Sequence, residues 1–302
     1  MFEAVGKNRA KTIFIVLGIF IFLMLIMELL LFHVLEFGRA FVLVAIVISA
    51  LVSFGTYWNS HKIVLSLHRA RPATPEQDAK LNNILEGLCL AAGMPKPALY
   101  VMDDPALNAF ATGRNHNNAV ICVTTGLLEK LDYYQLEGVV AHELAHIKNY
   151  DILLQTVAGI MVGAAIIAAR MATRSLMFGG SGGGRSRGGR SSGSGAAIIM
   201  VVGIVFAILA PIAGQMLKML LSRNREYLAD ATAASLTRNP EGLAGALEVI
   251  SGSAVPLRYA NDATEGLYIA TPRAELDGGK AASLFSTHPP IESRVEALRN
   301  FR

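Results

Sequence analysis

The sequence has few charged residues for its length. Charged residues make up 17% of the 302 residues and hydrophobic residues 53%, whereas ordinary soluble domains carry about 25% charged residues. The mean hydropathy of +0.44 is correspondingly high. This shortage of charge argues against a wholly soluble protein. It predicts that a large part of the chain lies in a membrane and that one modest globular unit remains outside it.

Cysteine is also scarce, which excludes a scaffold held by disulfides. Cys89 and Cys122 are the only two cysteines, and neither belongs to a Cys-x-x-Cys pair. We interpret both as reduced and buried, which favours a reducing compartment for their segment. The formal net charge is +4, but the Lys and Arg residues gather at the ends of apolar runs without aromatic residues between them. We therefore predict no nucleic-acid partner.

Apolar runs divide the chain. The first run, Thr12–Phe32, is longer than the roughly 7–15 apolar residues of a signal peptide, and no small-residue cleavage site follows it. The first two runs match the roughly 20 residues that cross a bilayer. A Gly/Ser/Arg-rich stretch, 179–195, is predicted to be a flexible loop. The four runs are Thr12–Phe32, Ala40–Trp58, Ile152–Ala169 and Ala196–Leu221.

The segments between these runs have mixed patterns typical of a globular α+β unit. Thr74 and Pro75 begin a predicted amphipathic helix that reaches Ala92. Asp132 with Gln135 resembles a capping box and predicts the start of another helix. Short strand-like stretches lie between the two helices, at Ala98–Met102, Asn108–Thr112 and Ala119–Val123. The predicted organisation is two N-terminal spans (1–58), a globular segment (59–151), an apolar helical hairpin (152–221) and a C-terminal segment (222–302).

The strongest chemical signal is His142-Glu143-Leu144-Ala145-His146. Residues four apart stand on one face of a helix, so His142 and His146 can bind one metal ion. Glu143 is rotated away from that face and flanks the metal, where it can act as a general base toward water. Short motifs also occur by chance, but this one lies in a strongly helical and apolar window. We therefore predict a zinc site with one zinc ion per chain.

Two histidines leave a catalytic zinc site one protein ligand short. Glu226, just after the fourth apolar run, is the candidate third ligand. Asp230 lies one turn further along the same helix face and can accept a hydrogen bond from the outer nitrogen of a ligating histidine. The alternative is an exposed helix with an acidic pair. His146 lies just before the third run and Glu226 just after the fourth, so a hairpin that crosses or re-enters the membrane returns them to the same side.

This combination resembles the HtpX-type membrane metalloproteases, relatives of the CAAX prenyl proteases. The resemblance covers nearly the whole chain, including Arg225-Glu226-Tyr227-Leu228-Ala229-Asp230 and Thr287-His288-Pro289-Pro290 followed by Arg294. It implies a zincin-like (gluzincin) domain with a small sheet, fused to about four transmembrane or membrane-associated helices. It also implies His142, His146 and Glu226 as zinc ligands and Glu143 as the general base.

The same resemblance places Asn108 and His288 over the cleft. On this basis we assign both to the catalytic residues, with His288 as a donor to the oxyanion. The alternative for His288 is a structural loop residue beside the last helix. The expected reaction is hydrolysis of peptide bonds in substrates that a sheet edge holds extended.

The resemblance further implies a multi-pass protein of the bacterial inner membrane with a cytoplasmic catalytic face. Its implied role is stress-related quality control of misfolded or damaged membrane proteins, so the expected partners are such substrates and the lipid bilayer. Cleavage of lipidated tails and a non-catalytic scaffold are the alternatives. An intact Glu143 argues against the scaffold, because a structural metal site needs no base.

Overall fold

A computed structural model describes residue 17 and residues 40–153, 155–156, 223–258, 267–270 and 288–301. The apolar runs 12–32, 152–169 and 196–221 lie almost entirely outside the described residues, and the Gly/Ser/Arg-rich stretch 179–195 lies wholly outside them. Within the part that is described, no helix has the length and apolar character that a membrane crossing requires. The predicted spans are therefore not confirmed.

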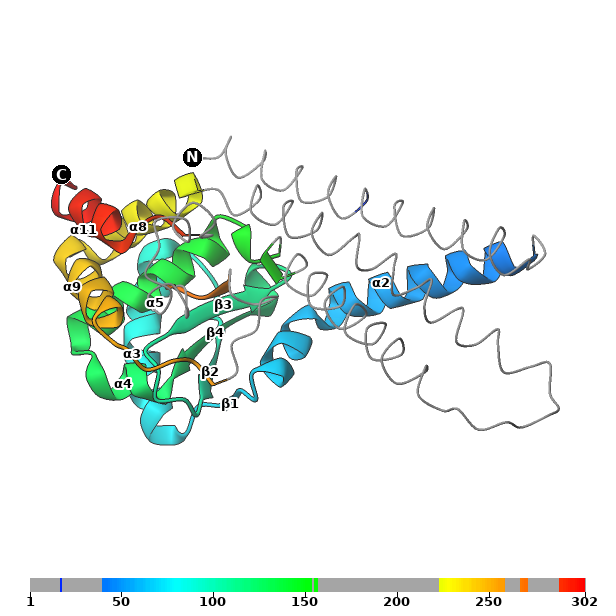
Figure 1. The fold of residues 1–302 in the computed structure, drawn as a ribbon, viewed down its shortest axis with the longest axis horizontal. Coiled ribbons are helices and arrows are strands. Elements are labelled where there is room, and N and C mark those ends of the chain that lie inside the picture. The colour runs from blue at the N-terminus through cyan, green and yellow to red at the C-terminus, as the bar shows by residue number, and fades with distance from the viewer. Residues whose placement is uncertain are drawn as a thin grey trace, which may run out of the picture.

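The described residues form helices around one small mixed sheet (Figure 1). The sheet has four strands in the order β1-β2-β4-β3. Strands β2 and β4 run parallel, and the other two pairs are antiparallel. The elements are α2 (Ala40–Leu67), β1 (Arg71–Pro72), α3 (Pro75–Ala92), β2 (Ala98–Met102), β3 (Ala109–Gly113), the 3-10 turn η2 (His116–Asn118), β4 (Ala119–Thr124), α4 (Thr125–Lys130), α5 (Tyr133–Lys148), α8 (Arg223–Thr237), α9 (Pro240–Ser251) and α11 (Ile291–Arg299).

Local capping chemistry sets the helix boundaries. Thr74 caps α3 in a reciprocal capping box with Gln77, and Gly93 ends the helix in the left-handed conformation with φ 65°. Asp132 forms the same kind of box with Gln135 at the start of α5. These features confirm both predicted helix starts. The predicted strand Asn108–Thr112 is shifted by one residue from β3, and the predicted strand Ala119–Val123 stops one residue before β4 does, because backbone pairing decides where a strand begins and stops.

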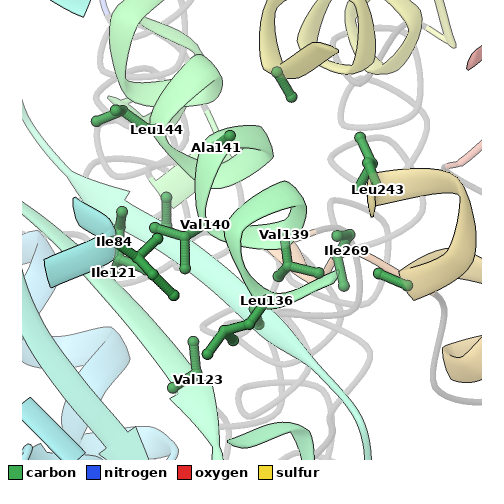
Figure 2. Packing of buried hydrophobic residues seen from close by; sticks show 14 of the residues in the cluster. Ile84, Ile121, Val123, Leu136, Val139, Val140, Ala141, Leu144, Leu243 and Ile269 are labelled. Atoms are coloured by element: carbon green, nitrogen blue, oxygen red, sulfur yellow. The ribbon is translucent and has the colours of Figure 1, made fainter. Parts of the chain in front are cut away.

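Helix α5 is the centre of the core. Eleven of its residues are buried, and Figure 2 shows Val140 pointing toward Ile84 and Ile121 while Val139 faces Ile269. Helix α9 crosses it closely at Gly138, where an added Cβ would lie 2.6 Å from the backbone nitrogen of Leu243. Packing on all sides therefore holds the motif-bearing helix rigidly against the sheet.

The sequence pattern predicts that the third apolar run follows directly on α5, but the helix ends first. Asn149 caps it, and Tyr150 adopts a left-handed conformation with φ 60°, which is uncommon for a bulky residue. The ring of Tyr150 lies 4.1 Å from that of His116, centroid to centroid. Helical backbone then resumes at Asp151. The turn changes the direction in which Asp151 points.

Candidate metal centre

Helix α5 presents two buried imidazoles to one point. The Nε2 atoms of His142 and His146 are 3.1 Å apart, and the ring planes are nearly perpendicular, at 89°. Two nitrogen ligands of one tetrahedral zinc ion lie about 3.3 Å apart, given bonds of about 2.0–2.1 Å. The spacing of the two nitrogens therefore fits two ligands of a single ion.

Helix α8 supplies a carboxylate to the same point. Glu226 is 4% exposed, with Oε2 at 3.7 Å from His142 Nε2 and Oε1 at 3.6 Å from His146 Nε2. The three ligand atoms lie within 4.8 Å of one another. The structure thus brings together the three residues that the sequence predicts as ligands, although the two helices that carry them are far apart along the chain.

A carboxylate accepts from the outer nitrogen of each imidazole. Asp230 Oδ1 lies 2.9 Å from His142 Nδ1, as the sequence predicts. Asp151 Oδ2 lies 3.4 Å from His146 Nδ1, and the sequence pattern did not indicate this partner. A five-residue separation does not place two residues on one helix face; only the break at Tyr150 brings Asp151 back. Such contacts fix the tautomer in which Nε2 is free to bind metal.

Each of these carboxylates is in turn held by an arginine. Arg294 of α11 is completely buried and donates from Nε and Nη2 to Asp230 at 2.8 and 2.7 Å. Its Nη1 donates to the carbonyl oxygen of Ile269 at 2.9 Å. Arg225 reaches Asp151 less closely, at 3.5 Å. The sequence marked Arg294 only as part of a resemblance, and its role as an anchor of Asp230 is visible only in the structure.

Glu143 lies beside the ligands without being one of them. It is 1% exposed, and within the described part of the chain its Oε1 has no hydrogen-bond partner. Burial raises the pKa of this carboxyl to about 7. A buried carboxylate oxygen without a protein partner suits a site that receives water, and a pKa near neutrality suits a proton carrier.

The charge states fit metal binding. Burial lowers the pKa of His142 to about 4, so its imidazole is neutral and can ligate. Burial opposes ionisation of Glu226, but the nearby His288, His146 and Arg294 outweigh it and hold the pKa of Glu226 well below its usual range. For His146, Asp151 and Glu226 outweigh burial and raise the pKa to about 9. The metal-free centre therefore retains a proton that a metal ion displaces.

His288 lies at this centre. It is 7% exposed, and its Nδ1 is 3.1 Å from Oε2 of Glu226. It precedes α11, the helix that carries Arg294. This contact places His288 beside the predicted metal ligands, and its role over the cleft as a donor to the oxyanion stays a prediction.

Asn108 has hydrogen-bond partners within the protein, and its predicted catalytic role stays a prediction. It precedes β3, is 3% exposed, and donates from Nδ2 to the carbonyl oxygen of Ala270 at 3.0 Å. Its Oδ1 accepts from the amide of Ala109, whose carbonyl oxygen accepts from Ile269 at 3.1 Å. Residues 267–270 thus already pair with the start of β3.

Comparison with known proteins assigns the chain to a family. The model of the family described as "Peptidase family M48" matches residues 75–302. A "Protease HtpX homolog" of Dictyoglomus thermophilum is 47% identical over 300 residues, covering 99% of this chain and 94% of that protein. Proteins with the same name in Listeria monocytogenes and Streptococcus uberis are 40% and 36% identical, with 99% of each chain covered.

A solved structure, titled "Crystal Structure of S. mikatae Ste24p", is also similar. Its sequence is 16% identical, with a TM-score of 0.49, and the match covers 99% of this chain and 67% of that one.

Proposed function

Because the chain belongs to peptidase family M48 and is a metalloprotease, we propose that it is a membrane-bound, zinc-dependent endopeptidase that hydrolyses misfolded or damaged membrane proteins. The observation that carries the proposal is the convergence of His142, His146 and Glu226 beside Oε1 of Glu143, which has no hydrogen-bond partner among the described residues. Two imidazoles and one carboxylate are a common ligand set of catalytic zinc.

Zinc bound there would polarise the scissile carbonyl and lower the pKa of water. Glu143 supplies the proton transfer. It would accept a proton from the attacking water at Oε1 and later deliver it to the leaving nitrogen, as a general base and then a general acid. His288, 3.1 Å from Glu226, is the proposed donor to the developing oxyanion.

Substrate binding is proposed at the outer edge of β3. An extended peptide adds to an exposed strand by main-chain hydrogen bonds, which makes recognition largely independent of sequence. The start of this edge pairs with residues 267–270, through Ile269 to Ala109 and through Tyr268 to Phe110. The substrate strand would therefore lie beyond Phe110, toward Ala111, whose backbone hydrogen-bonds to Glu143. Asn108 would contribute to substrate binding indirectly, because its side chain anchors residues 267–270 beside the start of β3.

The membrane-bound part of the proposal is supported by the apolar runs of the sequence and by exposed apolar side chains on α2, where Leu51 and Phe54 are 66% and 62% exposed. Large exposed apolar surface marks contact with a membrane or another protein. We place the protein in the bacterial inner membrane with the zinc centre on the cytoplasmic side, where reduced Cys89 and Cys122 are stable.

Glu143→Gln tests the proposal, because it preserves shape while removing the base. The full chain in detergent would be given an unfolded membrane protein and, separately, casein. We expect zinc binding to be retained and turnover to fall by at least about 10²-fold. Glu137→Gln, on the same helix and half-buried, is the matched control and should keep wild-type activity.

The metal requirement is tested in the same assay. Chelation should abolish cleavage, and added zinc should restore it. Cleavage of casein alone would support a protease while contradicting the proposed substrate class. Cleavage restricted to lipidated tails would favour the alternative specificity. Undiminished turnover in Glu143→Gln would overturn the proposed mechanism.

A further inference from the structure

Helix α2 carries a row of exposed apolar residues on the part that extends away from the sheet (Figure 1). Successive members are three or four residues apart, so they stand on one face of the helix. Phe54 and Trp58 stack with ring centroids 5.1 Å apart. The row consists of Val47 at 56%, Leu51 at 66%, Phe54 at 62% and Trp58 at 48% exposure.

The row ends where α2 meets the globular unit. The helix kinks at Asn59, which has φ −106° and ψ 15°. Arg114, in the connection after β3, covers the kink: its guanidinium carbon lies 4.3 Å from the centroid of the Trp58 ring. Nη1 of Arg114 also donates to the carbonyl oxygen of Trp58 at 2.8 Å. One arginine from the sheet is thus stacked on the aromatic residue that closes the apolar row.

Positive charge gathers at the same place. Lys62 follows Trp58 by one helical turn and is exposed. Within the described ranges, no carboxylate pairs with Lys62 or with Arg114. Lys62 is the neighbour of His61 in the sequence, and after burial the charges of Lys62 and Arg114 lower the pKa of that imidazole. Among the described residues, the apolar row is therefore bordered by two cations that no carboxylate neutralises.

We propose that Trp58, Lys62 and Arg114 form a binding site for the phosphate of an anionic phospholipid headgroup, at the level where α2 leaves the bilayer. The proposal rests on the membrane attachment proposed above. Tryptophan concentrates at the membrane–water interface, basic residues attract anionic lipid there, and the planar guanidinium matches phosphate oxygens in geometry. Because Arg114 belongs to the β3–β4 connection, such a lipid would also orient the sheet toward the membrane surface.

The chain has a single tryptophan, so its fluorescence reports on Trp58 alone. The full chain would be placed in nanodiscs that contain phosphatidylcholine and phosphatidylglycerol in fixed proportion. In one preparation the phosphatidylglycerol carries brominated acyl chains, and in the other the phosphatidylcholine does. Bromine quenches tryptophan only at close range, and the ratio of the two quenching efficiencies measures lipid selectivity at Trp58.

In the wild type we expect stronger quenching by the brominated anionic lipid. Lys62→Gln and Arg114→Gln should each reduce the selectivity by roughly fivefold, and the double variant should abolish it. Lys130→Gln, which removes an exposed lysine from α4, is the matched control and should leave selectivity unchanged. Casein cleavage should remain at the wild-type level in all four variants, since none touches the metal centre.

The outcomes separate the two proposals. Equal quenching by both lipids in the wild type overturns the headgroup site while leaving membrane attachment intact. Undiminished selectivity in the double variant also overturns it. Absence of quenching by either lipid contradicts attachment of α2 to the bilayer, and loss of casein cleavage on Glu143→Gln is measured independently of both.

Discussion

Asp230 connects the metal centre to the last helix. Replacing it with asparagine tests how much its charge contributes to zinc binding and to stability. The change preserves shape but removes the charge between His142 Nδ1, at 2.9 Å, and the buried guanidinium of Arg294, at 2.7 and 2.8 Å. The amide no longer enforces the tautomer of His142. Loss of such a partner typically weakens metal affinity or activity by about 10–100-fold.

Two estimates bound the cost in stability. Although burial raises the pKa of Asp230, Arg294 and His142 outweigh it and lower the pKa from 3.8 to about 2, which corresponds to about 2 kcal/mol. Breaking a buried ion pair by removing one partner costs about 3–5 kcal/mol. We therefore expect a loss of about 2–5 kcal/mol. In the wild type the pKa-linked part is present above pH 3.8 and is lost as pH falls through about 2.

Zinc affinity would be measured by competition with a chelator of known affinity, and stability by denaturant unfolding of the metal-free chain. Asp103→Asn is the matched control: it breaks an ion pair with Arg71 of similar length, 2.7 Å, but with the Asp103 side chain 65% exposed. Exposed pairs contribute about 0–1 kcal/mol, and zinc affinity should not change. If both variants bind zinc and unfold alike, the reasoning is refuted.

Further predictions concern the centre and its support. His288→Ala should retain zinc and lower kcat by about 10²–10³-fold with little change in KM; near-normal turnover with a lower Tm would make His288 structural. The raised pKa of His146, about 9, should stabilise the metal-free chain fully below pH 6.5 by about 3 kcal/mol, with the gain lost as pH rises through about 9. Asp151→Asn should flatten this dependence in unfolding measured at several pH values. Gly138→Ala should destabilise by about 1–3 kcal/mol, because the new methyl meets α9, whereas Gly87→Ala, where nothing lies within 4 Å, should be neutral or stabilising in the same thermal melts.

Helix starts are the part of the fold that local chemistry decides. The boxes at Thr74 and Asp132 depend on residues three apart, so their outcome is settled within one turn and could be predicted from the sequence. Tyr150 could not be predicted in the same way. Its left-handed backbone is unfavourable in isolation and is held by tertiary contact with His116.

The edge of the sheet also combines a feature that the local sequence decides with one that tertiary contact decides. Strand β3 could be predicted from its pattern to within one residue at each end, but its pairing with residues 267–270 could not. Residues 267–270 occupy its start through Ile269, and Asn108 turns inward to hold them. Pairing between segments so far apart in the chain leaves no periodic signal in either, so this pairing was outside the reach of pattern reasoning.

The sequence by itself determined the chemistry: His142, Glu143 and His146 have spatial relations set by the geometry of one helix, and Glu226 with Asp230 by that of another. Tertiary structure alone decided what surrounds them. Asp151 reaches His146 because the chain turns at Tyr150, and Arg294 reaches Asp230 because α11 packs against α8. Residues within a turn are placed by backbone geometry, whereas a buried charge finds its partner only when distant helices assemble into a core that excludes water.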